Sequence, residues 1–191
     1  MPKSDFTKAI IQQAARELSN TCLTLAELQK QMNFIASTLP EYPVVLDMGG
    51  VGTTLGPQIM AEIGDVRRFP RREKLVAFAG VDVPPYQSGQ FEAKDRHITK
   101  RGSSDLRKNL YQVIGCLMQH SMEKDPVYRF VTHKKAEGKH FYSYMVAGCN
   151  KFLRIYYARV KAYLNYLEQH ESNSLIDGSV GSEVVLQPLD C

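Results

Sequence analysis

The chain has 191 residues, a formal net charge of +4 and 43% hydrophobic residues, which is an ordinary composition for a globular protein. Wholesale disorder is therefore excluded, and no apolar run approaches the roughly 18 residues of a membrane-spanning helix. The N-terminus lacks the apolar core of a signal peptide, and the four cysteines form neither a CxxC pair nor a zinc-ligand pattern with histidine. We expect a cytoplasmic protein with reduced cysteines and no membrane partner.

The first expected element is one long helix over residues 5–39. Its apolar side chains recur mostly three, four or seven positions apart and form a narrow stripe between polar residues, as in a coiled-coil seam. We therefore predict that residues 1–40 form a coiled-coil-like arm that joins copies of the chain in a homo-oligomer. A helix that lies along its own domain is the alternative. The stripe consists of Phe6, Ile10, Ala14, Leu18, Leu25, Leu28, Met32, Ile35 and Leu39.

Residues 44–65 have the pattern of a helix-hairpin-helix: an apolar segment, a glycine-rich turn and a second helix that ends at Gly64. Glycine lets a backbone approach a phosphate closely, and the amides that open the second helix can bind it. Any tight turn between two helices can use glycine as well, so the pattern alone is not specific. The candidate phosphate contacts are Gly49, Gly50, Gly52 and Thr53.

Positive charge is concentrated in residues 67–108, where eleven Lys and Arg face five Asp and Glu, a local balance of +6. Since the whole chain carries +4, the remainder sums to about −2. Such a basic segment predicts a surface for a polyanion, most often nucleic acid, and the alternative is a solvated face without a partner. Within it, residues 81–103 form a turn-rich loop or hairpin of about twenty residues, a length that is usually functional.

Four more helices are expected in the second part of the chain. They cover residues 73–79, a segment that begins at a cap on Ser103 or Ser104 and runs to about 122, then 127–136 and about 143–169. The second of these is expected to bury one face, formed by Leu106, Leu110, Val113, Ile114 and Leu117. Residues 41–169 thus form a compact helical domain, and residues 170–191, rich in Ser and Gly, form a flexible tail. The predicted fold class is mainly α.

Neither histidines nor carboxylates suggest a metal site in this chain, because the histidines lack ligand spacing and the acids are scattered. A nucleophilic serine is the other route to phosphate chemistry; it needs an exposed hydroxyl and cationic neighbours. Ser88, followed by Gly89 inside the basic loop, meets these conditions. Thr99 is a second hydroxyl in the same region. From the residues alone, a turn serine with no catalytic role remains the alternative for Ser88.

Three segments in order carry a resemblance to a known family: GGVGTTLGPQIMAEIGDVRRF (49–69), KLVAFAGVDVPPYQSGQF (74–91) and HITKRGSSDLRKNLYQ (97–112). Together they closely resemble the C-terminal domain of the IS110 transposase family, also called IS116 or IS902. This family groups transposases of bacterial insertion sequences with pilin-gene invertases. The resemblance covers roughly residues 44–165.

The resemblance implies a two-part DNA recombinase, in which a RuvC-like domain binds Mg²⁺ and the C-terminal domain supplies a serine. It maps the family's Ser-Gly signature onto Ser88, and its basic motif onto Lys100, Arg101 and Arg107. The implied partners are DNA, as element ends and target, and a structured guide RNA in the members that use one. Assembly as dimers or tetramers and a nucleoid-associated place in the bacterial cytoplasm are also implied. Thr99 stands where many relatives have serine.

The sequence starts at the helical arm, so we expect the RuvC-like domain and its Mg²⁺ to lie outside this chain, which would itself hold no cofactor. Our interpretation is the C-terminal part of a transposase, with Ser88 as nucleophile, and it leaves open whether the chain alone is an enzyme. The alternatives are a non-catalytic helix-hairpin-helix module for DNA binding and dimerisation, or a decayed gene product. The candidate phosphate clamps are Arg96, Lys100, Arg101, Arg107 and Lys108.

Overall fold

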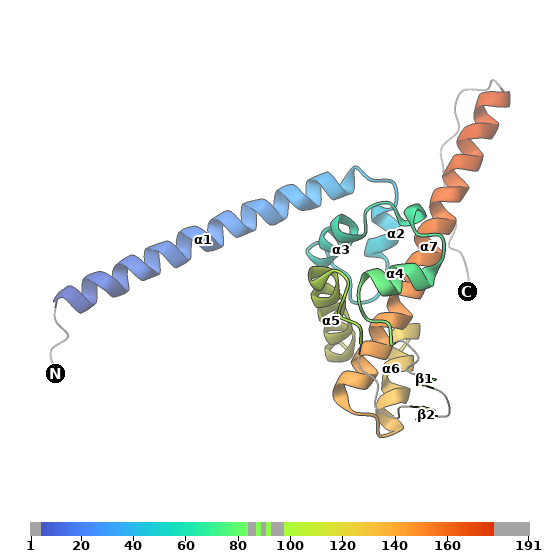
Figure 1. The fold of residues 1–191 in the computed structure, drawn as a ribbon. Coiled ribbons are helices and arrows are strands. Elements are labelled where there is room, and N and C mark those ends of the chain that lie inside the picture. The colour runs from blue at the N-terminus through green and yellow to red at the C-terminus, as the bar shows by residue number, and fades with distance from the viewer. Residues whose placement is uncertain (1–4, 84–86, 89–90, 93–97, 178–191) are drawn as a thin grey trace.

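The computed structural model describes residues 5–83, 87–88, 91–92 and 98–177 (Figure 1). The described part is mainly helical, as predicted, and within it no helix is both long and apolar enough to cross a membrane. The elements in chain order are α1 (Asp5–Ser37), α2 (Tyr42–Leu46), α3 (Leu55–Ile63), the 3-10 turn η1 (Val66–Arg68), α4 (Arg72–Phe78), β1 (Gln87–Ser88), β2 (Phe91–Glu92), α5 (Ser104–Gln119), α6 (Pro126–Ala136) and α7 (Phe141–Asp177).

Helix α1 extends away from the rest of the chain instead of lying along it (Figure 1). It ends before Pro40, which fixes φ and lacks an N–H donor, so the predicted helix over 5–39 is confirmed with an end at Ser37. Ala36 is its one buried residue in the described part of the chain, and the hydroxyl of Tyr42 donates to Asn33 Oδ1 at 2.6 Å. The apolar stripe of α1 is therefore left open to solvent.

The core forms where α4, α5 and α6 pack against α7, and α3 packs against α5 (Figure 1). Gly148 of α7 lets α6 come close, since a Cβ at this position would lie 2.6 Å from Val131 Cγ2. The predicted inner face of α5 is confirmed, because each of its members is buried. These members are Leu106, Leu110, Val113, Ile114 and Leu117.

Two helix ends differ from the prediction by more than two residues. Helix α5 ends at Gln119 and not near 122, because Ser121 has a φ of 47°, which a right-handed helix cannot include. Helix α7 continues to Asp177, past the predicted end at 169, since the sequence holds no Gly or Pro between that point and Gly178. Residues 170–177 are therefore helical and not a tail. The prediction for the tail beyond them falls outside the described residues.

Candidate nucleic-acid interface

The glycine-rich turn lies between α2 and α3, where the sequence predicts a hairpin. Half of this turn packs against the domain. A Cβ on Gly49 would lie 2.4 Å from Asp125 Oδ2, and a Cβ on Gly50 would lie 2.7 Å from the carbonyl oxygen of Val113. Gly50 also has a φ of 75°, which favours glycine. These two glycines therefore allow the turn to approach α5 and the start of α6.

The other half of the turn faces solvent. Gly52 and Thr53 are exposed, and no atom lies within 4 Å of the position of a Cβ at Gly52. The carbonyl of Gly52 accepts the Gly56 N–H at 2.8 Å, so this exposed backbone is held by the first turn of α3. Of the four predicted phosphate contacts, Gly52 and Thr53 are thus accessible to a ligand, and Gly49 and Gly50 have a packing role.

Both ends of the basic loop are tied together at one point. The backbone N–H of Thr99 donates to the Asp82 carbonyl at 3.1 Å, and the Thr99 hydroxyl donates to Asp82 Oδ1 at 2.5 Å. The next residue continues the pairing, because the N–H of Lys100 donates to the Gly80 carbonyl at 3.1 Å. The chain therefore leaves the domain after Asp82 and returns beside it at Thr99. We call residues 80–82 and 99–103 the loop base.

The loop base is closely packed. The N–H of Ser103 donates to the Phe78 carbonyl at 2.8 Å, and a Cβ on Gly102 would lie only 1.9 Å from that same oxygen. Gly80 has a φ of 65° and would clash with the Gly102 nitrogen if it carried a side chain. Lys100 adopts a φ of 53° without being glycine, which is a sparsely populated conformation. The loop base is thus fixed by backbone contacts that allow little change.

Ser103 connects the loop base to two helices. Its Oγ accepts the Leu106 N–H at 3.0 Å, so the predicted cap at Ser103 or Ser104 is confirmed at Ser103. The same hydroxyl donates to Glu62 Oε2 of α3 at 2.6 Å. The start of α5 is therefore held against α3 as well as against the end of α4.

The predicted phosphate clamps that the structure describes fall into two kinds. Arg107 is half-buried, and its Nη1 donates to the Ala79 carbonyl at 3.1 Å, so it helps to hold the loop base. Lys100, Arg101 and Lys108 are exposed. In the described ranges, none of these three side chains forms an ion pair or a hydrogen bond, so their charges are available to a polyanion.

Several other cations of the basic segment already have partners. Arg67 binds Asp65 at 2.8 Å, and this hydrogen-bonded contact holds the pKa of the Asp65 carboxyl below its ordinary value. Arg72 pairs with Glu73 at 3.0 Å. The guanidinium of Arg68 lies over two phenylalanine rings, 4.6 and 4.7 Å from their centroids. The local charge of +6 therefore overstates the number of cations that are free to bind a ligand.

The predicted nucleophile lies in a two-stranded hairpin. In sequence, this hairpin falls between residues 82 and 99 of the loop base. Ser88 of β1 is paired with Phe91 of β2 in antiparallel register, and Gln87 is paired with Glu92. This fits the prediction of a loop or hairpin in this region. The side chain of Ser88 and the whole of Arg96 fall outside the described residues, so their predicted roles stay predictions.

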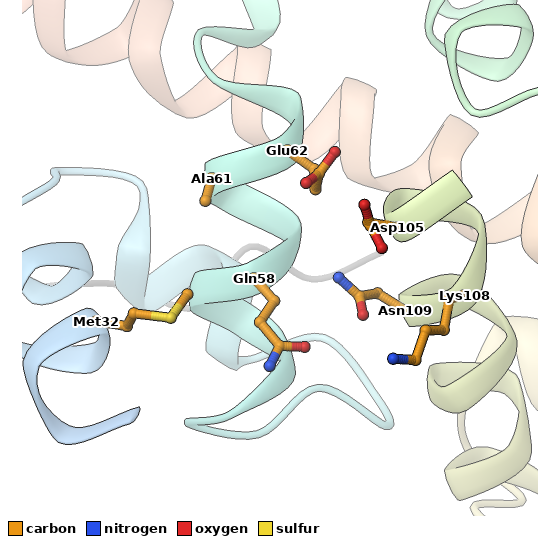
Figure 2. Close-up of a pocket in the computed structure, with 7 residues that line it drawn as sticks. All are labelled: Met32, Gln58, Ala61, Glu62, Asp105, Lys108 and Asn109. Carbon is orange, nitrogen blue, oxygen red and sulfur yellow. The ribbon is translucent and has the colours of Figure 1, made fainter. Parts of the chain in front are cut away.

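A shallow depression of about 250 Å³ lies between α1, α3 and α5 (Figure 2). Asn109, which is buried, points from α5 towards Gln58 of α3, and Lys108 lies at the rim. Two carboxylates and a single lysine line it, a mixture that does not select for a phosphate. The lining residues are Met32, Gln58, Ala61, Glu62, Asp105, Lys108 and Asn109.

Comparison with known proteins identifies relatives of the segment that contains the glycine-rich turn and the loop base. Residues 42–129 match the model of the transposase family IS116/IS110/IS902. The predicted resemblance to this transposase family is confirmed. A stretch of 108 residues, 56% of the chain, is 28% identical to the transposase for insertion sequence element IS1111A of Coxiella burnetii (strain RSA 493 / Nine Mile phase I). The matched stretch covers 29% of that transposase's length.

The match to the transposase family spans α2 to the first part of α6 and so includes the glycine-rich turn and the loop base. It ends within the first residues of a second basic segment that the sequence analysis missed. Residues 126–155 contain six Lys and Arg but one acid, Glu137. A running count of charge beyond residue 108 would have found this segment. It coincides with α6 and the first part of α7, where exposed aromatic residues also gather.

Proposed function

We propose that this chain is the DNA-binding C-terminal part of a transposase or site-specific recombinase that moves an insertion sequence, with Ser88 as its nucleophile. One observation carries the proposal: the loop base joins Asp82 to Thr99, so the segment that contains the Ser88 hairpin starts and ends at a single point beside exposed cations. A nucleophile must return to one position relative to its bound phosphate, and a loop anchored at both ends favours this. The family match of residues 42–129 supports the same assignment.

The DNA-binding surface would combine two elements. Lys100, Arg101 and Lys108 supply unpaired positive charge near the start of α5, and Gly52 and Thr53 supply exposed backbone before α3. Contacts of both kinds grip phosphates and fix the register of a duplex without reading its sequence. In this proposal α2, the turn and α3 act as a helix-hairpin-helix in which only the solvent-facing half contacts DNA. The duplexes would be the element ends and the target, and a guide RNA would be a second polyanion.

The proposed step is a transesterification at phosphorus. The Ser88 oxygen would form a bond to the scissile phosphorus as the bond to the deoxyribose oxygen breaks, the serine proton passing to a base and the leaving oxygen taking up a proton. Cationic side chains near the hairpin would stabilise the charge that develops on the phosphate. Mg²⁺, held by a RuvC-like domain outside residues 1–191, would supply further charge stabilisation.

A homo-oligomer through α1 is the second part of the proposal. The apolar stripe of α1 remains exposed along most of its length, with Phe6 at 75% and Leu18 at 66% exposure. A stripe of this width is covered when two such helices form a coiled coil. Pairing of the arms would bring two DNA-binding domains into one assembly, as cutting two element ends requires.

A non-catalytic nucleic-acid-binding module is the second candidate function. It is favoured by the exposed, unpaired cations Lys100, Arg101 and Lys108 and by the exposed stripe of α1, which suffice for binding and pairing without a nucleophile. Such a module would bind duplex backbone through the same cations and dimerise through α1. It would form no covalent link to DNA.

The test is a search for a covalent protein–DNA adduct. The chain is mixed with a purified RuvC-like domain from a relative, Mg²⁺ and labelled element-end DNA, and the products are separated on a denaturing gel. We expect an adduct that Ser88→Ala abolishes and that Ser104→Ala, a change at an exposed serine of α5, preserves. No adduct in any variant, together with a salt-sensitive shift on a native gel, would support the non-catalytic module instead.

A further inference from the structure

Exposed aromatic rings gather where α7 begins. Phe141 is 50% exposed and Tyr142 is 64% exposed, unusual values for large rings on a folded domain. Their centroids lie 5.3 Å apart at an interplanar angle of 80°, and Phe141 meets the half-buried Tyr144 in a similar way at 5.4 Å and 77°. His140 lies 5.7 Å from the Tyr142 ring. We call His140, Phe141 and Tyr142 the aromatic platform.

The contacts among these rings hold the aromatic platform in place. Edge-to-face packing fixes Phe141 between its two tyrosine neighbours, and Tyr144 packs against the core. The backbone is fixed as well, because the N–H groups of Ser143 and Tyr144 both donate to the His140 carbonyl, at 2.9 and 3.2 Å. The rings therefore have little side-chain freedom to lose when a ligand stacks on them.

Positive charge lies in the residues that lead into the aromatic platform. Lys135 in the last turn of α6 and Lys139 between α6 and α7 are both exposed. The one acid of residues 126–155, Glu137, is already bound to Lys134 at 2.8 Å, which holds the pKa of the Glu137 carboxyl below its ordinary value. The platform also sits at the N-terminal end of a 37-residue helix, whose dipole adds partial positive charge. An apolar protein partner would gain nothing from these charges, whereas a polyanion would.

Aromatic faces next to cations are how proteins hold unpaired nucleotides, since bases stack on the rings and phosphates contact the cations. A closed duplex keeps its bases stacked on one another and offers no free base face to such rings. We propose that the aromatic platform, with Lys135 and Lys139, binds unpaired nucleotides of single-stranded DNA or RNA. This inference rests on the proposed nucleic-acid-binding function and adds a second site, separate from the cations near the loop base.

The first experiment compares single-stranded and duplex binding. Fluorescence anisotropy is measured for the full chain with labelled oligo-dT, oligo-rU and a matched duplex, at one salt concentration. We expect Phe141→Ala with Tyr142→Ala to weaken binding of the single strands roughly tenfold and to leave duplex binding within about twofold. A preference for dT or rU tells whether displaced DNA or RNA is the natural source of the strand.

Tyr166→Ala is the matched control. Tyr166 is 49% exposed on the same helix, and its ring centroid lies 4.1 Å from that of His170, but it lies towards the other end of α7, away from the aromatic platform. The control is expected to bind every probe as the unchanged chain does. Equal losses for single strands and duplex in the platform variant, or no loss at all, would overturn the inference. Failure of the unchanged chain to bind duplex would instead count against the proposed function.

A fluorescence reporter tests the stacking directly. The chain contains no tryptophan, so Tyr142→Trp introduces a single indole, and Tyr166→Trp gives its control. Stacking of a base on an indole quenches its emission. We expect oligo-dT or oligo-rU to quench the fluorescence of Tyr142→Trp and to leave that of Tyr166→Trp unchanged. Binding without quenching at position 142 would show that single strands are held elsewhere, and would overturn the inference.

Discussion

Glu62 and Ser103, which are 41 residues apart in the sequence, are joined by a hydrogen bond of 2.6 Å. Ser103 also caps α5 and pairs its backbone with the end of α4. A single short side chain thus connects α3, α4 and α5 at the point where the basic loop returns to the domain. The position of the proposed DNA-binding cations depends on this junction, since Arg101 precedes Ser103 by two residues and Lys108 lies in α5, which Ser103 caps.

Ser103→Ala is expected to destabilise the chain by about 1–2 kcal/mol, because it removes a helix cap and leaves Glu62 without its donor. The measurement is urea unfolding followed by circular dichroism. Ser104→Ala, one position later and outside the cap, should change stability by less than about 0.5 kcal/mol. Equal effects of the two changes would mean that the capping contact contributes little.

Ser103→Asp gives a second view of the same junction. Aspartate is a good cap in general, but here its carboxylate would face Glu62. We expect Ser103→Asp to lower the free energy of unfolding while Glu62 is present. Combining it with Glu62→Gln should restore the free energy of unfolding. If Ser103→Asp alone were as stable as the unchanged chain, the side chains of Ser103 and Glu62 would not be in close contact in solution.

Gly102→Ala is expected to disrupt the loop base, since the new Cβ would meet the Phe78 carbonyl oxygen at 1.9 Å. The backbone must move, so we expect a stability loss of at least about 2 kcal/mol and weaker DNA binding. Gly115→Ala is the matched control, because it lies in α5 with no atom within 4 Å of the new Cβ. This control should stabilise the chain by roughly 0.5–1 kcal/mol, as alanine does in a helix interior. A stable Gly102→Ala variant that binds DNA normally would contradict the described packing.

The role of α1 is tested by sedimentation velocity. Leu18→Glu puts a charge on the apolar stripe and is expected to convert an oligomer into monomers. Gln12→Glu adds the same charge on the opposite side of the helix, at 3.6 residues per turn, and should leave the oligomer intact. A monomer in the unchanged chain at micromolar concentration would contradict the proposed pairing of the arms.

The sequence predicted the helices well, because apolar periodicity and capping residues act locally: the cap at Ser103 and the buried face of α5 are as expected. The loop base was not predictable in the same way. Its contacts join Asp82 to Thr99 and Phe78 to Ser103, and nothing in the local pattern of either segment specifies such a pairing. The packing role of Gly49 was missed for the same reason, since its neighbour Asp125 is distant in sequence.

Salt dependence separates the cations that contact phosphate from those that only add charge. If Arg101 and Lys108 each neutralise one phosphate, then Arg101→Gln and Lys108→Gln should each lower the slope of log K against log[salt] by about 1. Both changes should weaken binding to unrelated duplexes equally, because phosphates carry no sequence information.

Arg72→Gln is the control: it removes the same charge, but Arg72 is already paired with Glu73, so this change should leave the slope nearly unchanged. An equal change of slope for all three variants would mean that net charge, and not the surface around the loop base, determines binding. A lower slope for Arg101→Gln and Lys108→Gln alone would place the DNA backbone beside the point where the Ser88 hairpin joins the domain.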